Sequence, residues 1–587
     1  MLIKTKIICT IGPSVSTYEK IVALIEAGMN VARLNFSHGT HEEHLRVIEL
    51  LKKARSDLKI PLAIMLDTKG PEIRLKKLKE GQIFFRPGHH WILQNTEIEG
   101  DMERASISPG YILDNLKVGT KIFFDDGYVS SHVIQKIKNG VVIEIENGGL
   151  IRSGKGVNIP DANIEMPAIT DQDVADIRFG CSQDIDIIAA SFIRSAEDVL
   201  VIKKLLDEEN KSDTLVIAKI ENKEGIKNFS SILHVADGIM IARGDLGVEV
   251  PLSKVPRFQK MMIKKCYLVG KSSVTATQML ESMIGNPRPT RAEASDVANA
   301  IYDSTSAVML SGETAIGTYP IEVVKMMRSI IAEAESDFKY SEFFLQHSAV
   351  DYHDVPSAVT LAAVKTAYNS HAKCIFVFTT RGFTASLVSR LRPNMPIIAM
   401  TSDIKCYHQM SIKWGVIPVL GKDVNNLHLA LSELSEFSLE KNYVSYGDLI
   451  VIIAGTPFGI SGTTNMMIVE NIGDVLIRGQ KGQGKKLYGN ITLVHSSDSK
   501  QPYEARNAIL VIPACNDDYL PLLRESLGVI LQNEGEDFKS EEYALEICEK
   551  LGKSLIIRRD TTCLILKEGQ LVTLDPEKAL VYKGVVL

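Results

Sequence analysis

Short apolar runs recur along residues 1–320, and each of them ends in polar or charged residues. Stretches with helical spacing of apolar residues separate the runs. Buried parallel strands consist of nearly continuous Val, Ile, Leu and Ala, so repeated alternation of strand and helix indicates an α/β protein with a (β/α)8 TIM barrel. The eight runs occupy residues 7–12, 30–37, 62–70, 185–192, 215–222, 238–245, 273–278 and 306–313.

The polar ends of these runs are the candidate functional residues. In a TIM barrel, the loops that follow the strands build the active site. We therefore expect these side chains to meet at one mouth of the barrel. They are Arg33, Asn35, Ser37, Asp67, Thr68, Lys219, Glu221, Asp245 and Thr277.

The pattern changes several times along the chain. Residues 73–166 contain short β-type segments between Gly, Asn and Asp turns, which predicts a small β-barrel inserted into the TIM barrel of residues 1–72 and 167–340. A domain inserted in an active-site loop is placed to act as a lid. A second alternating block at 341–474 predicts an open α/β domain. A Gly/Lys/Gln linker at 475–486 then leads to an extra mixed α/β domain at 487–587.

Composition limits the classes of partner and location. The chain has 587 residues, a net charge of −6 and 45% hydrophobic residues, so several real cores are expected, with no general attraction to nucleic acid or to an anionic membrane. Eight scattered cysteines without a C-x-x-C pair suit reduced thiols. The sequence shows no signal peptide and no apolar stretch long enough to cross a bilayer. We therefore expect a cytoplasmic protein.

The segments AKIENKEG and ARGDLGVE carry the strongest local signal. Lys219 and Glu221 are two residues apart on a strand, so they share one face, and Asp245 ends the next strand after Gly244. A lysine beside two carboxylates suits a divalent cation held through oxygen ligands next to an anionic substrate. An ion pair inside the barrel is the alternative.

A second cluster lies in ARLNFSHG and MLDTKGPEIR. Asn35, Ser37, Asp67 and Thr68 are compact oxygen donors that suit a monovalent or alkaline-earth cation. The alternative is that Ser37 caps a helix and that Asp67 and Thr68 make loop hydrogen bonds. Arg33 and Arg74 add guanidinium groups that match phosphate geometry.

Three further patterns could indicate functional residues: Thr277, the glycine-rich residues 479–485, and the histidines His41 and His44. Thr277 either contacts a substrate or serves as a buried structural hydroxyl. Residues 479–485 fit G-x-x-x-x-G-K, but Lys486 stands where a phosphate-binding loop needs a hydroxyl, so we reject that reading. His41 and His44 are three residues apart and do not form H-E-x-x-H, so the segment is expected to open a solvated helix.

Six long motifs in register resemble the pyruvate kinase family over residues 1–474. They are MNVARLNFSHG, LDTKGPEIR, AKIENKEG, ARGDLGVE, TATQMLESM with NPRPTRAEASDVANAI, and SGETAIGTYP. The resemblance implies transfer of the phosphoryl group of phosphoenolpyruvate to ADP, giving pyruvate and ATP, with Mg²⁺ (or Mn²⁺) and K⁺ as cofactors. It also implies a homotetramer and regulation by a phosphorylated metabolite.

The resemblance assigns a role to each matching residue. Arg33 would bind the substrate phosphate, Lys219 would stabilise the transferring phosphoryl group, and Thr277 would lie near the proton source. The substrate contacts would be Arg33, Lys219, Gly244, Asp245 and Thr277; the Mg²⁺ ligands Glu221 and Asp245; the K⁺ ligands Asn35, Ser37, Asp67 and Thr68; the nucleotide contacts Asn35, Phe36, Ser37, His38 and Arg74; and the effector contacts Thr379, Thr380, Thr384 and Gly462. Glu72 implies dependence on K⁺, since relatives with Lys there tend to work without it.

The chain departs from the family pattern in three places. Ser195 stands where a Lys or Arg is usual, and Arg381, Gly382 and Phe383 replace a more common Ser-Gly-Arg. The tail resembles a phosphohistidine-type domain but lacks its Thr-Ser-His motif, with Glu541, Glu542 and Tyr543 in its place. Two other functions remain open: a metal-dependent lyase of the phosphoenolpyruvate/pyruvate barrel type, and a metabolite sensor without catalysis.

Overall fold

The computed structural model describes residues 2–160, 166–348, 353–421, 427–456, 462–533, 536–558 and 565–586. Residues 457–461, which directly precede the expected effector contact Gly462, lie outside the described residues. The chain divides into two compact units. The first contains residues 1–361, 377–422 and 454–465, and the second contains residues 362–376, 423–453 and 466–587.

Eight parallel strands close into a barrel in the first unit, which confirms the predicted TIM barrel. Each strand lies inside one of the eight apolar runs or starts one residue before it. In order around the barrel the strands are β1 (Lys6–Thr10), β17 (Ala307–Leu310), β16 (Ser272–Ala276), β15 (Gly238–Ala242), β14 (Leu215–Ile220), β13 (Ile187–Ala190), β3 (Ala63–Asp67) and β2 (Val31–Asn35).

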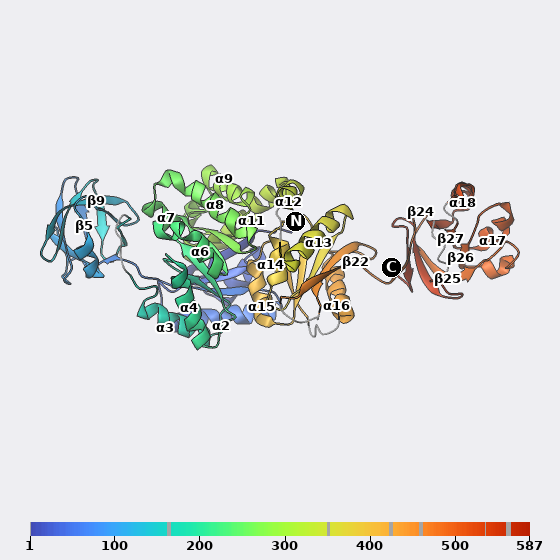
Figure 1. Ribbon diagram of the computed structural model, residues 1–587, viewed down its shortest axis with the longest axis horizontal. Coiled ribbons are helices and arrows are strands. Elements are labelled where there is room, and N and C mark those ends of the chain that lie inside the picture. The colour runs from blue at the N-terminus through green and yellow to red at the C-terminus, as the bar shows by residue number, and fades with distance from the viewer. Residues whose placement is uncertain are drawn as a thin grey trace. The chain divides into compact units, whose positions relative to one another are not determined.

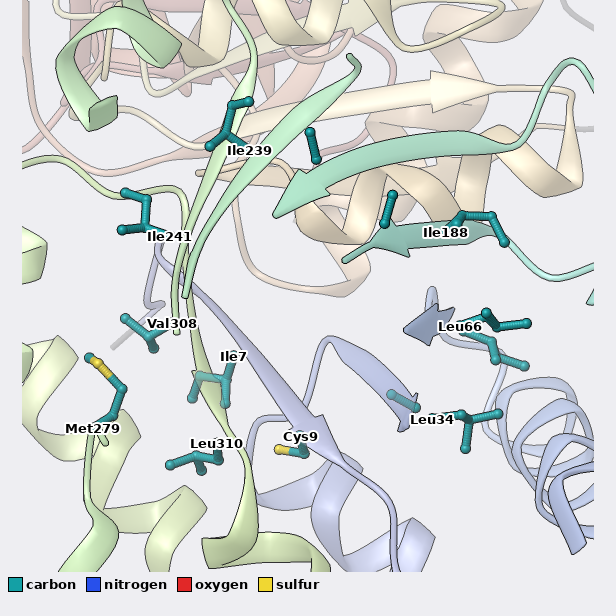
Figure 2. Close-up of a cluster of buried hydrophobic side chains, with 14 of the residues drawn as sticks. Ile7, Cys9, Leu34, Leu66, Ile188, Ile239, Ile241, Met279, Val308 and Leu310 are labelled. Carbon is teal, nitrogen blue, oxygen red and sulfur yellow. The ribbon is translucent and has the colours of Figure 1, made fainter. Parts of the chain in front are cut away.

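Helices cover the outside of the barrel (Figure 1). Alternate strand residues such as Ile7, Cys9 and Leu34 point outward and pack against them, as Figure 2 shows. The helices between residues 18 and 348 are α1 (Tyr18–Ala27), α2 (His41–Asp57), α3 (Asp171–Ser182), α4 (Ala196–Glu208), α5 (Lys223–Lys227), α6 (Phe229–Val235), α7 (Arg243–Glu249), α8 (Val255–Leu268), α9 (Arg291–Tyr302), α10 (Gly312–Ala315), α11 (Pro320–Asp337) and α12 (Tyr340–Ser348).

The insertion between β3 and α3 is all β, as predicted. Its core contains Phe85, Trp91 and Phe124. An antiparallel bridge between Arg74 and Gly156 joins the two ends of its main sheet, so the sheet curls back on itself. That sheet has the order β12 (Val157–Asn158), β8 (Lys121–Phe124), β9 (Val129–Ile137), β10 (Gly140–Ile145), β6 (His90–Gln94), β7 (Arg104–Ser108) and β4 (Arg74–Leu75), and β11 (Gly149–Arg152) pairs with β5 (Gln82–Phe85).

The α/β block that follows contains an open sheet of five strands, in agreement with the predicted open α/β domain. Their order is β20 (Val416–Leu420), β19 (Ile397–Thr401), β18 (Cys374–Phe378), β21 (Leu449–Gly455) and β22 (Thr464–Asn471). An open sheet of this kind needs helices on its faces to bury both sides. The helices of this block are α13 (Val355–Asn369), α14 (Phe383–Ser389), α15 (Ile404–Gln409) and α16 (Leu427–Glu440).

The C-terminal part of the second unit is an eight-stranded mixed sheet with the helices α17 (Leu520–Glu525) and α18 (Phe538–Leu551). Its four middle strands from β25 to β28 pair in parallel. The order is β23 (Val475–Arg478), β30 (Leu580–Lys583), β29 (Leu571–Asp575), β25 (Leu487–Leu493), β26 (Ala508–Ile512), β27 (Gly528–Gln532), β28 (Ser554–Arg558) and β24 (Lys481–Gln483).

The segment 475–486 is not the linker that its composition suggested. It contains β23 and β24, the two edge strands of the C-terminal sheet. Its glycines stand where backbones approach closely: a Cβ at Gly482 would lie 2.0 Å from the carbonyl oxygen of Pro576, and one at Gly479 would lie 2.3 Å from a methyl group of Ile556. Close packing, rather than flexibility, requires glycine here.

Candidate active site

The period of two along the barrel strands builds the site. Apolar residues such as Met65 and Ile217 fill the interior of the barrel. The next inward positions on the same strands, Asp67 and Lys219, lie two residues further toward the mouth. Polar groups therefore replace the apolar layer where the barrel opens, which is where catalytic side chains are expected.

Lys219 lies at the centre of this polar layer. Its Nζ is 3.0 Å from Asp67 Oδ1 and 3.0 Å from Glu221 Oε1, and it donates a hydrogen bond of 2.7 Å to Ser191 Oγ. Burial alone would lower the pKa of Lys219, but Asp67 and Glu221 raise it above its usual range. The ammonium group therefore stays charged in a site with little water.

Arg33 reaches the same carboxylate from β2. Its Nε donates to Asp67 Oδ2 at 2.6 Å, and one of its terminal nitrogens donates to Thr10 Oγ1 at 2.9 Å. Burial would raise the pKa of Asp67, yet the Arg33 guanidinium and the Lys219 ammonium hold it below its usual value. Asp67 thus fixes two cationic groups at the mouth, where an anionic substrate would find both.

The carboxylates beside Lys219 fit a divalent cation. Glu221 is 2% exposed and accepts a hydrogen bond from the Phe192 backbone. Asp245 lies half-buried in the first turn of α7, and burial together with Glu221 raises its pKa to about 7. Asp126 and Glu72 raise that pKa further, so negative charge is in excess at this point, and a metal ion would balance it.

No group of three or more His, Cys, Asp or Glu side chains that could hold a metal ion occurs among the residues that the structure describes. A cation at Glu221 and Asp245 would therefore take its remaining ligands from substrate or water. Mg²⁺ is commonly held in this way, through one or two carboxylates plus phosphate oxygens.

The end of β16 is strained and braced. Thr277 has φ +63° and Gln278 has φ +53°, which is unusual for a β-branched residue such as threonine. Thr277 Oγ1 accepts from Gly244 N at 2.9 Å and donates to Ala276 O at 2.7 Å, while Arg243 donates to Thr277 O at 2.8 Å. The hydroxyl predicted to face the substrate therefore also holds α7 against β16.

The predicted K⁺ ligands form two local groups on adjacent strands. Asn35 pairs with Asp67 in the register of β2 and β3, and Asn35 Oδ1 accepts from Ser37 N at 3.2 Å. Thr68 Oγ1 accepts from Ser191 N at 3.1 Å. Ser37 does not cap α2, because Thr40 does so through a capping box, and this removes the capping alternative for Ser37.

The predicted nucleotide contacts lie at different depths. Phe36 is 7% exposed, with its ring stacked at 3.9 Å on His44, so only its backbone faces outward. His38 is exposed, and its carbonyl accepts from His44 at 2.9 Å. Arg74 is paired with Glu72 at 2.7 Å and donates to Gly154 O at 2.8 Å, so Arg74 is oriented by the lid.

A cavity of about 150 Å³ lies between the lid and the barrel mouth. Glu72 and Asp126 line it from the lid side, and Asp245 and Arg194 line it from the barrel. Asn158 of the lid also donates to Glu249 at 3.3 Å. The cavity therefore brings carboxylates of both parts to one opening at the barrel mouth.

Ser195 and the expected effector residues have local partners. Ser195 is the N-cap of α4 in a capping box with Asp198. Thr384 Oγ1 lies 2.6 Å from Thr464 Oγ1, and Thr380 O accepts from Thr401 at 3.3 Å. Thr379 N donates to Met400 O at 3.0 Å, and Gly462 has φ +83°.

Sequence reasoning missed three residues near the mouth: Ser191, Arg243 and Glu313, which fixes the loops that contain Leu280 and Ser311. Ser191 contacts Lys219 and Asp67, and it follows Ala189 by two residues on the inward face, so the strand period could have identified it. Arg243 spans α7, α9 and the loop after β16 through Asp296 and Thr277. Glu313 is fully buried and accepts from the backbones of Leu280 and Ser311, contacts that no sequence pattern signals.

Comparison with known proteins covers the whole chain. Residues 2–324 match the family model "Pyruvate kinase, barrel domain", and residues 357–470 match "Pyruvate kinase, alpha/beta domain". A pyruvate kinase of Geobacillus stearothermophilus is 41% identical over 583 residues, 99% of each chain. Those of Sporosarcina psychrophila and Staphylococcus aureus (strain USA300) are 41% identical over 584 and 583 residues, again 99% of each chain. Across the described segments, no helix has the length and hydropathy needed to span a membrane.

Proposed function

Since the chain belongs to the pyruvate kinase family, we propose that its barrel mouth transfers the phosphoryl group of phosphoenolpyruvate to ADP, giving pyruvate and ATP. The observation that carries this proposal is the position of Lys219. Its buried ammonium lies within 3.0 Å of two carboxylates, Asp67 of β3 and Glu221 just after β14, beside Arg33 at the same mouth. Phosphoryl transfer depends on positioning and on neutralising anionic charge, and this arrangement supplies both.

Arg33 and Lys219 would have different roles toward the phosphoryl group. Arg33 is fixed by Asp67 and Thr10, so its guanidinium is preorganised to bind the substrate phosphate. The ammonium of Lys219 would stabilise the negative charge that develops as the phosphoryl group moves to ADP. Ser191 and Asp67 hold the ammonium in place, which limits the reorganisation needed in the transition state.

Glu221 and Asp245 would hold Mg²⁺ or Mn²⁺, as the surplus of carboxylates there requires. Such a cation, when bound, polarises phosphate oxygens and balances their charge. Asn35, Ser37, Asp67 and Thr68 would hold K⁺, because their amide, hydroxyl and carboxylate oxygens are the ligands that such an ion prefers. Gly244 and Asp245 at the start of α7 would contact the substrate.

ADP would bind along the segment Asn35–His38, with Arg74 reaching its phosphates. The Glu72 partner of Arg74 lines the cavity under the lid, so lid position and nucleotide binding would be linked. The enolate left by phosphoryl transfer needs a proton on carbon. A water molecule beside the hydroxyl of Thr277 would deliver this proton. The hydroxyl is held by hydrogen bonds with Gly244 N and Ala276 O.

Regulation and assembly extend the proposal. A phosphorylated metabolite would bind near Thr379, Thr380, Thr384 and Gly462, and the protein would form a homotetramer. Sigmoidal phosphoenolpyruvate kinetics that a sugar phosphate or nucleoside monophosphate makes hyperbolic would support the effector site. Hyperbolic curves that neither compound changes would contradict it, and a monomer at micromolar concentration in light scattering would contradict the tetramer.

The direct test measures pyruvate formation from phosphoenolpyruvate with and without ADP, Mg²⁺ and K⁺. We expect formation that needs ADP and the divalent ion and that rises with K⁺. Pyruvate formation that does not need ADP would favour the lyase alternative. No turnover by a folded protein would favour a sensor.

A further inference from the structure

A small cavity lies at the opposite end of the barrel from the active site, and positive charge surrounds it. Its volume is about 10 Å³, which is the space of one water molecule or one monatomic ion. We call it the basic cavity, and its lining residues are Tyr267, Gly270, Lys271, Ser272, Ser306, Ser386, Ser389, Arg390, Arg392 and Lys413.

The position of this cavity separates it from the catalytic mouth. Ser272 is the first residue of β16, whereas Thr277 follows the last residue of the same strand. Ser306 likewise precedes β17. On the other side, α14 contributes Ser386 and Ser389. The cavity therefore lies between the amino ends of two barrel strands and one helix of the α/β block.

The lining contains four basic residues and no acidic one. Arg392 is 2% exposed, and Arg390 is 7% exposed. Burial lowers the pKa of Arg392 to about 9 and also lowers the pKa of Lys413. Because no acidic residue lines the cavity, its walls provide no counter-charge. A buried cation without an opposite charge beside it costs free energy.

The hydrogen bonds of Arg392 are all to neutral groups. Its terminal nitrogens donate to Ser389 O at 2.8 Å and to Ser304 O at 2.9 Å, and its guanidinium stacks 4.6 Å from the Trp414 ring. Its Nε has no hydrogen-bond partner within the described segments. Arg392 thus keeps a full positive charge and an unused donor beside the cavity.

Acidic groups act on these cations from outside the cavity walls. Asp237 opposes the lowering of the pKa values of Lys413 and Lys271, and Arg390 contributes to lowering the pKa of Asp354. Glu335 affects the pKa of Arg392, but its carboxylate accepts from the backbones of Lys4 and Thr5 at 2.8 and 2.7 Å. Lys271 Nζ is held by the carbonyls of Leu233 and His234. Lys413 Nζ donates to Ser386 Oγ, which leaves the other ammonium protons available.

We propose that the basic cavity binds one small inorganic anion the size of chloride. The Nε of Arg392 and the ammonium group of Lys413 are donors of the kind that such an ion needs, whereas the hydroxyls of Ser386 and Ser389 already donate to carbonyl oxygens. The volume of about 10 Å³ excludes a larger oxyanion unless side chains move. The bound ion would stabilise the contact of α14 with β16 and β17 without touching a substrate.

The first test soaks crystals of the full-length protein in sodium bromide and locates the ion by its anomalous scattering. We expect a bromide peak within hydrogen-bond distance of Arg392 and Lys413. An empty basic cavity at molar bromide would overturn the proposal. A phosphate bound there in place of bromide would overturn the assignment of a chloride-sized ion.

The second test measures thermal stability without substrate, at constant ionic strength, as gluconate is replaced by chloride. We expect Lys413→Gln to raise the half-saturating chloride concentration about tenfold, since it removes one charge-assisted contact. Lys264→Gln, an exposed lysine on α8, is the matched control and should leave it unchanged. Arg392 is unsuitable as a first variant, because it also stacks on Trp414. An equal chloride response in wild type and Lys413→Gln would contradict the proposal.

Discussion

Two buried cations at opposite ends of the barrel, Lys219 and Arg392, are held in different ways, although the amino end also contains the ion pair of Arg55 with Asp186. At the carboxyl ends of the strands, Lys219 and Arg33 are paired with buried carboxylates. At the amino ends, Arg392 meets carbonyls, hydroxyls and an aromatic ring, and Lys6 donates to Val416 O at 2.7 Å. The same eight strands therefore support chemistry at one end, and contacts with residues 404–416 at the other. The carboxyl end is arranged for an anion that reacts, and the amino end is arranged for stability.

The largest effect on catalysis is expected at Lys219, at the carboxyl end of the barrel. We expect Lys219→Met to lower kcat by about a thousandfold or more, with a modest change in the KM for phosphoenolpyruvate, because the ammonium acts mainly on charge that develops during transfer. Steady-state kinetics measure this. The matched control is Lys227→Met, an exposed lysine on α5. A folded Lys219→Met enzyme with near-normal kcat would refute the role of this residue.

Removing a carboxylate at the same end should act through the metal. Glu221→Gln is expected to slow turnover by roughly a hundredfold and to raise the half-saturating Mg²⁺ concentration, since one charged ligand becomes neutral. Titration of activity with Mg²⁺ checks it, with the exposed Glu208→Gln on α4 as control. An unchanged metal titration would remove Glu221 from the ligand set.

Glu72 links the inserted β domain to the carboxyl end of the barrel, because it pairs with Arg74 and lines the cavity at the mouth. We expect the native enzyme to need K⁺ and Glu72→Lys to reduce that need, since a tethered ammonium would replace the ion. The variant also loses the ion pair with Arg74, so a several-fold rise in the KM for ADP is expected. Assays in Tris-based buffer free of K⁺ and Na⁺ measure both effects. Full native activity in that buffer would rule out the K⁺ requirement.

At the amino end, His408 should affect stability and not catalysis. Leu62 N donates to His408 Nδ1 at 3.3 Å, and burial, with the Arg55 charge, lowers the pKa of His408 to about 3. The neutral ring is favoured in the folded state, so its stabilising effect is complete above about pH 6.5 and is lost as the pH falls toward 3.

Between pH 6.5 and 4.5 this linkage corresponds to roughly 2 kcal/mol. His408→Gln keeps an acceptor that does not titrate, so its Tm should fall less over this range than that of the wild type, with kcat at pH 7.5 unchanged. The pKa of Asp186, raised to about 6 by burial, opposes the effect in both proteins and cancels in the difference. Parallel pH profiles of Tm would contradict the assignment.

The C-terminal sheet should have the smallest effect on catalysis. Its parallel strands also end in loops, but its one histidine, His495, lies after β25 and not at the position of the Thr-Ser-His motif, which Glu541, Glu542 and Tyr543 occupy. Removing residues 475–587 should leave kcat within about threefold, because none of these residues lines the cavity at the mouth.

A cut at residue 486, at the end of the expected linker, should behave differently. It would leave β23 and β24 without their sheet, with exposed strand edges that promote aggregation. Light scattering and activity of the two truncated proteins make the comparison. A folded tetramer ending at residue 474 that lost turnover would show that the tail takes part in the reaction.

The pattern of apolar and polar residues is sufficient to predict the barrel and most of the polar layer at its mouth. Continuous apolar runs can be buried on both faces only in a parallel sheet with helices outside, and the period of two then places Arg33, Asp67 and Lys219 inward. Local rules of this kind also predicted the all-β insertion and the open α/β block.

Contacts between segments far apart in sequence follow from the folded chain and from no local pattern. The fold placed Ser191 on Lys219, Arg243 on the loop after β16, and Arg392 on Ser304. It also turned the glycine-rich segment 475–486 into two edge strands, because Gly482 fits against Pro576, nearly a hundred residues away. Composition suggests flexibility at such a segment, whereas close packing between distant backbones is a property of the folded chain alone.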